Sequence, residues 1–120
     1  MALVLVIDED IDFSALVKRV ITRQGHEVAT FVETKDAIQW LEEHLPDVAI
    51  IGAGKYGEKA RDLVSKLNSA GITKSRLILS TGIGSVSDVQ REFRDRVRSV
   101  IPKGSSLDEL ERLVSSVILS

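Results

Sequence analysis

Apolar and polar residues follow two different patterns, which alternate along the chain. Short runs that are almost wholly apolar are typical of strands buried on both faces of a sheet. Between them, apolar residues recur at steps of three and four, which is typical of a helix with one buried face. The expected strands are residues 3–7, 27–32, 48–51, 77–79 and a short one around 100–101.

The helical pattern occurs five times, and each occurrence carries an apolar stripe. The stripes are Phe13, Leu16, Val17, Val20 and Ile21; Ala37, Ile38, Leu41 and Leu45; Leu63, Val64 and Leu67; Val86, Val89, Phe93 and Val97; and Leu110, Leu113, Val114 and Val117. The residues expected to end helices are Gly25, Pro46 and Gly71. The residues expected to cap helix starts are Thr34, Ser87 in a capping box with Gln90, and Ser106 in a capping box with Glu109.

Regular alternation of strand and helix predicts a parallel sheet with helices on both faces. The runs at 3–7, 48–51 and 77–79 are wholly apolar and are expected at the centre of the sheet. The runs at 27–32 and 100–101 include or adjoin polar residues and are expected at its edges. The flavodoxin-like strand order 2-1-3-4-5 has these centres and edges. We therefore expect a doubly wound α/β fold in which residues 1–120 form a single domain.

Composition narrows the class of protein further. An apolar share of 43% and a charged share of 28% over 120 residues are typical of a globular domain that folds alone. A formal charge of −2 gives no electrostatic reason to expect nucleic-acid binding. The absence of cysteine excludes disulfides and cysteine metal sites. No apolar run approaches the about 18 residues of a membrane span, and no signal peptide is visible, so we expect a cytoplasmic protein without membrane association.

The residues at the ends of the expected strands resemble those of the response regulator receiver domain, over the whole chain. Asp8 and Glu9 match the family's acidic pair after the first strand. Thr81 matches the hydroxyl residue that ends the fourth strand, and Lys103 matches the lysine after the fifth. The resemblance implies a signalling module of two-component, or phosphorelay, systems. It also implies that these residues surround the end of the third strand, where the family carries a phosphorylated aspartate.

The sequence departs from the family at that aspartate, because Gly52 occupies its position. A glycine has no carboxylate, so it can neither attack a phosphoryl donor nor form an acyl phosphate. Val100 also replaces the family's aromatic switch residue, and Pro102 precedes Lys103 where the family has a lysine–proline step. The resemblance is therefore to a degenerate receiver, or pseudo-receiver, that signals through protein contacts without phosphorylation. We expect no enzyme activity, since no nucleophile–base pair is recognisable.

The acidic pair also supplies the candidate metal ligands. Asp8 and Glu9, together with the carbonyl of Gly54, make a poor site for Mg²⁺ or Ca²⁺, so no cofactor is expected. We expect Lys103 to bridge to Asp8 or Glu9, because charged groups in a partly dry pocket are costly when unpaired. We interpret Thr81 as a hydrogen-bonded strand terminus.

A glycine-rich loop offers an alternative function. Gly52, Gly54 and Gly57 form a G-x-G-x-x-G pattern between a strand and a helix, which is the context of a dinucleotide fingerprint. Such glycines would let a pyrophosphate approach backbone N–H groups. The acidic residue expected about 20 positions later is missing, since that strand ends in Ser80 and Thr81. A nucleotide- or anion-binding sensor at residues 52–57 is thus the alternative to protein interaction.

Arginines crowd the fourth expected helix and the approach to the fifth strand. Most such clusters are solvated surfaces, and Glu92 and Asp95 balance this one. Receivers commonly use the same face for dimers and effectors. The candidate interaction face therefore consists of Arg91, Arg94, Arg98 and Val100. The expected partners are another protein, a fused output domain or a second copy of the chain.

Overall fold

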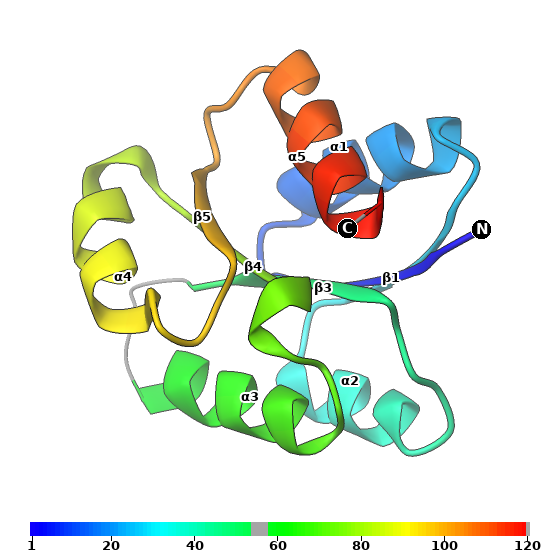
Figure 1. The fold of residues 1–120 in the computed structure, drawn as a ribbon, viewed down its shortest axis with the longest axis vertical. Coiled ribbons are helices and arrows are strands. Elements are labelled where there is room, and N and C mark those ends of the chain that lie inside the picture. The colour runs from blue at the N-terminus through cyan, green and yellow to red at the C-terminus, as the bar shows by residue number, and fades with distance from the viewer. Residues whose placement is uncertain (54–57, 120) are drawn as a thin grey trace.

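A five-stranded parallel sheet lies at the centre of the computed structural model, which describes residues 1–53 and 58–119 (Figure 1). The strands are β1 Leu3–Ile7, β2 Glu27–Phe31, β3 Val48–Gly52, β4 Leu77–Thr81 and β5 Ser99–Pro102. Their order in the sheet is β2-β1-β3-β4-β5, and every neighbouring pair is parallel. The predicted flavodoxin-like order is therefore confirmed.

Helices cover both faces of this sheet. They are α1 Ile11–Arg23, α2 Thr34–Leu41, α3 Glu58–Ser69, α4 Val86–Phe93 and α5 Leu107–Leu119, with single 3₁₀ turns at Lys74–Arg76 and Ile83–Ser85. Figure 1 shows α1 and α5 on one face and α2 and α3 on the other. Side chains of α4 pack into the same core layer as those of α3. None of the helices in the described part of the chain has the length and apolarity needed to span a membrane.

Alternation along the central strands produces the two core layers. On β1, Val4 and Val6 pack against α1 and α5, whereas Leu5 and Ile7 pack against the helices of the opposite face. Successive side chains of a strand point to opposite faces, so a wholly apolar strand contributes side chains to both core layers. β3 and β4 are buried in the same way, and β2 is largely half-exposed at the edge. The prediction of which strands are central and which are edges is confirmed.

Glycines end two helices as predicted. Gly25 follows α1 with a φ of +88°, and Gly71 follows α3 with a φ of +99°. This left-handed conformation is readily available to glycine, and it lets the next two N–H groups bond back to the last turn. Accordingly, the N–H of Ile72 donates to the carbonyl of Leu67 over 3.0 Å. The Ser106 cap is also confirmed, because its Oγ accepts from the N–H of Glu109.

Three other predicted helix boundaries are wrong. Thr34 is the first helical residue and Glu33 precedes it at the cap position, without a side-chain cap. α4 begins at Val86 rather than after Ser87, because the 3₁₀ turn at Ile83–Ser85 leads straight into it.

The second helix also ends earlier than predicted. α2 stops at Leu41, and Leu45 lies outside it and is 65% exposed. Pro46 disfavours a helical conformation for the residue before it, and the chain closes instead with short-range bonds from the N–H groups of Glu42 and Glu43. The apolar stripe therefore extended further than the helix.

Candidate functional site

The carboxyl ends of the central strands bring together residues that lie far apart in the sequence. Asp8 follows β1, Gly52 ends β3, Ser80 and Thr81 end β4, and Lys103 follows β5. We call this group the strand-end pocket. Parallel strands place all their carboxyl ends at one edge of the sheet, so the strand order alone accounts for the assembly.

The carboxylate of Asp8 is the centre of the strand-end pocket. Its residue is 6% exposed, and donors from three other parts of the fold reach it. Oδ1 accepts from the Nζ of Lys103 over 2.9 Å and from the N–H of Asp10 over 2.9 Å. Oδ2 accepts from the Oγ of Ser80 over 3.2 Å. A buried carboxylate needs such partners to offset its lost hydration, and here both oxygens have them.

Gly52 makes this arrangement sterically feasible. β3 lies between β1 and β4, and Gly52 is in register with Ser80. A Cβ atom built at Gly52 would lie 2.5 Å from the Cγ of Asp8 and 2.6 Å from each of its oxygens. Real Cβ atoms are not found that close to other heavy atoms, so the carboxylate of Asp8 occupies the volume of the missing side chain.

Lys103 forms the predicted bridge, and its partner is Asp8 rather than Glu9. Its Nζ also lies 3.5 Å from Oδ2 of Asp10 and 5.2 Å from the centroid of the Phe13 ring. The side chain is 23% exposed, so this ion pair is partly shielded from water. Glu9 is exposed.

Asp10 is a residue of this site that sequence reasoning missed. Its side chain caps α1, with Oδ1 accepting from the N–H of Phe13 over 3.0 Å. That hydrogen bond, aided by the charge of Lys103, holds the pKa of Asp10 below its ordinary value of 3.8. An aspartate directly before an amphipathic helix is a recognisable capping signal.

Thr81 agrees only in part with its predicted role. Its backbone carbonyl accepts from the N–H of Lys103 over 2.9 Å, which ties the end of β4 to the segment after β5. The residue is 1% exposed, and its Oγ1 has no hydrogen-bond partner in residues 1–53 and 58–119. The neighbouring Ser80, which sequence reasoning passed over, provides the hydroxyl that bonds to Asp8.

The strand-end pocket does not fit the divalent cation that the family resemblance implies. Mg²⁺ and Ca²⁺ require several oxygen ligands whose lone pairs face the ion. The carboxylate of Asp8 faces an ammonium group and two further donors instead, and Glu9 is exposed. The carboxylate of Asp8 is therefore already paired within the protein, and these residues do not form a cation site.

The glycine-rich loop extends outside the described residues, since Gly54 and Gly57 belong to 54–57. Gly52 itself is the last residue of β3. The next N–H group, of Ala53, donates to the carbonyl of Ser80 over 2.8 Å. A ligand at this loop stays a prediction, and the N–H of Ala53 is not available to it in this conformation.

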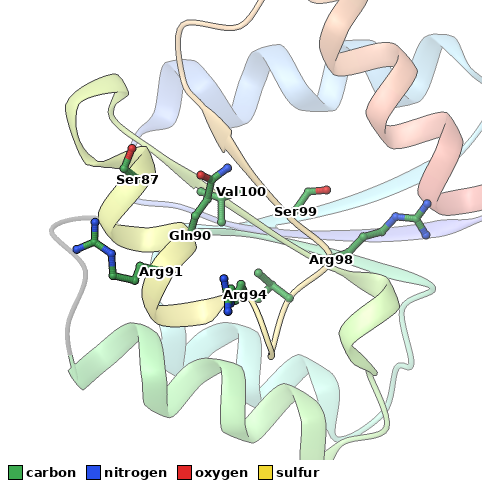
Figure 2. A pocket seen from close by; sticks show the side chains of 8 residues that line it. Ser87, Gln90, Arg91, Arg94, Arg98, Ser99 and Val100 are labelled. Carbon is green, nitrogen blue, oxygen red and sulfur yellow. The ribbon is translucent and has the colours of Figure 1, made fainter.

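The predicted interaction face lies in a groove between α4 and β5 (Figure 2). The groove has a volume of about 460 Å³, and its lining includes Gln90, Arg91, Arg94, Arg98, Ser99 and Val100. All four residues proposed from the sequence thus line one concavity, which we call the α4–β5 groove. Figure 2 shows the guanidinium groups of Arg91, Arg94 and Arg98 well apart from one another, with the side chain of Arg98 extending away from α4.

Comparison with known proteins agrees with the fold. The virulence transcriptional regulatory protein PhoP of Salmonella choleraesuis (strain SC-B67) is 30% identical over 84 residues, which cover 70% of this chain and 38% of that protein. The chain thus spans well under half the length of this relative.

Solved structures of low sequence identity share the fold. A response regulator from Thermotoga maritima has a TM-score of 0.86 at 20% identity, covering 100% of this chain and 99% of that one. The receiver domain of NtrX from Brucella abortus has a TM-score of 0.83 at 18% identity, covering 98% of each chain. Residues 4–115 match the family model described as the response regulator receiver domain, and the chain belongs to that family.

Proposed function

We propose that this receiver domain works in two-component signalling through protein contacts, without being phosphorylated itself. The observation that carries the proposal is the glycine at the end of β3, where the family has its phospho-acceptor. Phosphoryl transfer to this site requires a carboxylate nucleophile, and Gly52 has none. We do not expect Asp8 to replace it, because its carboxylate is buried and held in place by hydrogen bonds from Lys103, Ser80 and the backbone.

The α4–β5 groove is the surface that we propose for these contacts, with an acidic segment of another protein as its occupant. Arg91 is exposed on α4, Arg94 is exposed directly after it, and Arg98, before β5, also lines the groove. Guanidinium groups pair well with carboxylates, and several of them along one groove would select an acidic chain. Val100 provides a half-buried apolar surface between them, which suits one apolar side chain of the partner.

Phosphorylation is tested by incubating the chain with acetyl phosphate and Mg²⁺ and measuring its intact mass. We expect no added phosphoryl group, whereas a receiver domain that keeps its aspartate is labelled under the same conditions. A phosphorylated adduct of the unmodified chain would overturn the proposal.

Partner chemistry is tested with a short glutamate-rich peptide that contains one leucine, by following the amide NMR signals of the domain. We expect signals of α4 and β5 to shift saturably, and the affinity to fall at least tenfold in Arg94→Glu. The matched control is Arg19→Glu, which reverses an exposed charge on α1 at the opposite face of the sheet. Equal loss in both variants would mean that only net charge is sensed.

The oligomeric state of the chain distinguishes between two possible occupants of the α4–β5 groove, an acidic partner and a second copy of the chain. Sedimentation of the chain alone is expected to give a monomer at all concentrations. A concentration-dependent dimer that Arg94→Glu abolishes would replace the acidic partner with a second copy of the chain.

A further inference from the structure

In the strand-end pocket, the side chain of Asp8, which follows β1, occupies the space of a side chain that β3 lacks at Gly52. The Cγ of Asp8 lies 2.5 Å from where a Cβ at Gly52 would be. Asp8 follows a strand adjacent to β3, and its carboxylate extends over Gly52 to Ser80 on β4. A carboxylate is therefore present at the end of β3, although β3 does not provide it.

This carboxylate also makes contacts that join the edge of the sheet. Ser80 donates to it from β4, Lys103 from the segment after β5, and the N–H of Asp10 from the start of α1. Ion-paired and charge-assisted bonds of this kind are the stronger ones in a protein. One buried side chain thus connects four elements across Gly52.

We infer that Asp8 is an internal ligand of the strand-end pocket, which fills the missing acceptor side chain's space and excludes a divalent cation. The ammonium of Lys103 stands 2.9 Å from Oδ1 of Asp8, and the Asp8 side chain is 5% exposed. A cation would have to displace that ammonium and move the carboxylate away from Ser80. Breaking a buried ion pair leaves an uncompensated charge, which opposes the exchange.

A consequence is that the pocket has one arrangement that does not depend on Mg²⁺ or phosphate. A ligand shifts a conformational equilibrium only when it binds the two states with different affinity. Asp8 neutralises Lys103 and occupies the space next to Gly52 in the absence of any ligand. This inference concerns the pocket alone and holds whether or not an acidic partner binds at the α4–β5 groove.

The direct test is a Mg²⁺ titration of the unmodified chain at millimolar concentrations, followed by amide NMR and by the Tm. We expect no saturable shift at Asp8, Asp10, Gly52 or Lys103 and no change in Tm. A saturable shift at these residues, with a rise in Tm, would overturn the inference because it shows cation binding.

The coupling between positions 8 and 52 is tested with Gly52→Ala, Asp8→Ala and the double variant. In the unmodified background, Gly52→Ala is expected to lower the Tm by about 4 °C or more, because the new Cβ displaces the Asp8 carboxylate. In the Asp8→Ala background the same change should cost little, since its steric obstacle is gone. Independent, additive effects would contradict the inference.

A third variant distinguishes an internal ligand from a merely structural contact. Gly52→Asp places a second carboxylate where Asp8 now lies, so the two cannot keep these positions. We expect this variant to be less stable than the unmodified chain. Its Tm should rise when Mg²⁺ is added. A Tm as insensitive to Mg²⁺ as that of the unmodified chain would mean that Asp8 is not what excludes the cation.

Discussion

The Oγ of Ser80 donates a hydrogen bond to Oδ2 of Asp8 over 3.2 Å, although β4, which carries Ser80, and β1, which Asp8 follows, are not neighbours. β3 lies between them, and the bond passes over Gly52, which has no side chain to block it. Side-chain bonds in a sheet usually join adjacent strands. The geometry of the strand-end pocket therefore depends on position 52 being a glycine.

Ser80→Ala is expected to lower the free energy of unfolding by about 1–3 kcal/mol, because it removes a hydrogen bond to a buried charged group. Urea denaturation followed by circular dichroism measures the change. Ser87→Ala, at an exposed position on α4, is a suitable control. Equal stability of the two variants would show that Ser80 contributes nothing through Asp8.

Thr81→Val is not expected to lower the stability, in contrast to Ser80→Ala. The hydroxyl of Thr81 is buried without a partner in the described residues, so replacing it with a methyl group of similar size removes a desolvation cost. The free energy of unfolding should be unchanged or higher by about 1 kcal/mol. A clear loss of stability would mean that this hydroxyl is hydrogen-bonded in solution.

Lys103→Met is expected to lower the free energy of unfolding by about 3 kcal/mol, because it leaves the buried carboxylate of Asp8 without its cation. The matched control is Lys35→Met, whose ion pair with Glu33 is exposed and should contribute less than about 1 kcal/mol. Thermal unfolding of both variants provides the comparison. An unchanged Tm in Lys103→Met would refute the role assigned to this ion pair.

Asp10 gives the stability of the domain a defined dependence on pH. Because folding lowers its pKa, ionised Asp10 stabilises the fold at pH values above its ordinary pKa of 3.8. This contribution is lost as the pH falls below 3.8 and through the folded-state pKa. Asp10→Asn keeps an acceptor for the N–H of Phe13 but removes the charge.

The difference in unfolding free energy between the unmodified chain and Asp10→Asn should therefore be largest near neutral pH and shrink below pH 3.8. Urea denaturation at a series of pH values measures this difference. A difference that stays constant down to pH 3 would show that Asp10 gains its stabilisation from something other than its charge.

The fold could be predicted from the sequence because burial dictates it at most positions. A wholly apolar run such as Val48–Ile51 is stable only between two covered faces, and this places it at the centre of the sheet. Helix boundaries were less predictable, because Ser85 and Ser87 carry the same capping chemistry and the preceding turn decides between them. Leu45 continued the apolar stripe of α2 although Pro46 disfavours a helical conformation for the residue before it, so the stripe alone overestimated the length of the helix.

The strand-end pocket was predictable in its membership but not in its geometry. The family resemblance and the cost of unpaired charge indicated that Lys103 would bridge to Asp8 or Glu9, and it bridges to Asp8. The sequence could not show that the carboxylate of Asp8 would lie over Gly52, since this depends on side-chain torsions. The available signal was that Ser80 is a polar residue in β4, a strand with no exposed face, so its hydroxyl needs a hydrogen-bond partner inside the protein.

The ion pair between Asp8 and Lys103 also has a consequence for the order of events during synthesis. Its two members are separated by 95 residues, so at a translation rate of 5–20 residues per second Asp8 is made roughly 5 to 20 s before its cation. Until then, the central strand β1 ends in a carboxylate that has no ammonium to receive it. The nascent chain can thus assemble β1 to β4 around an open edge, but it can complete that edge only when the segment after β5 has left the ribosome.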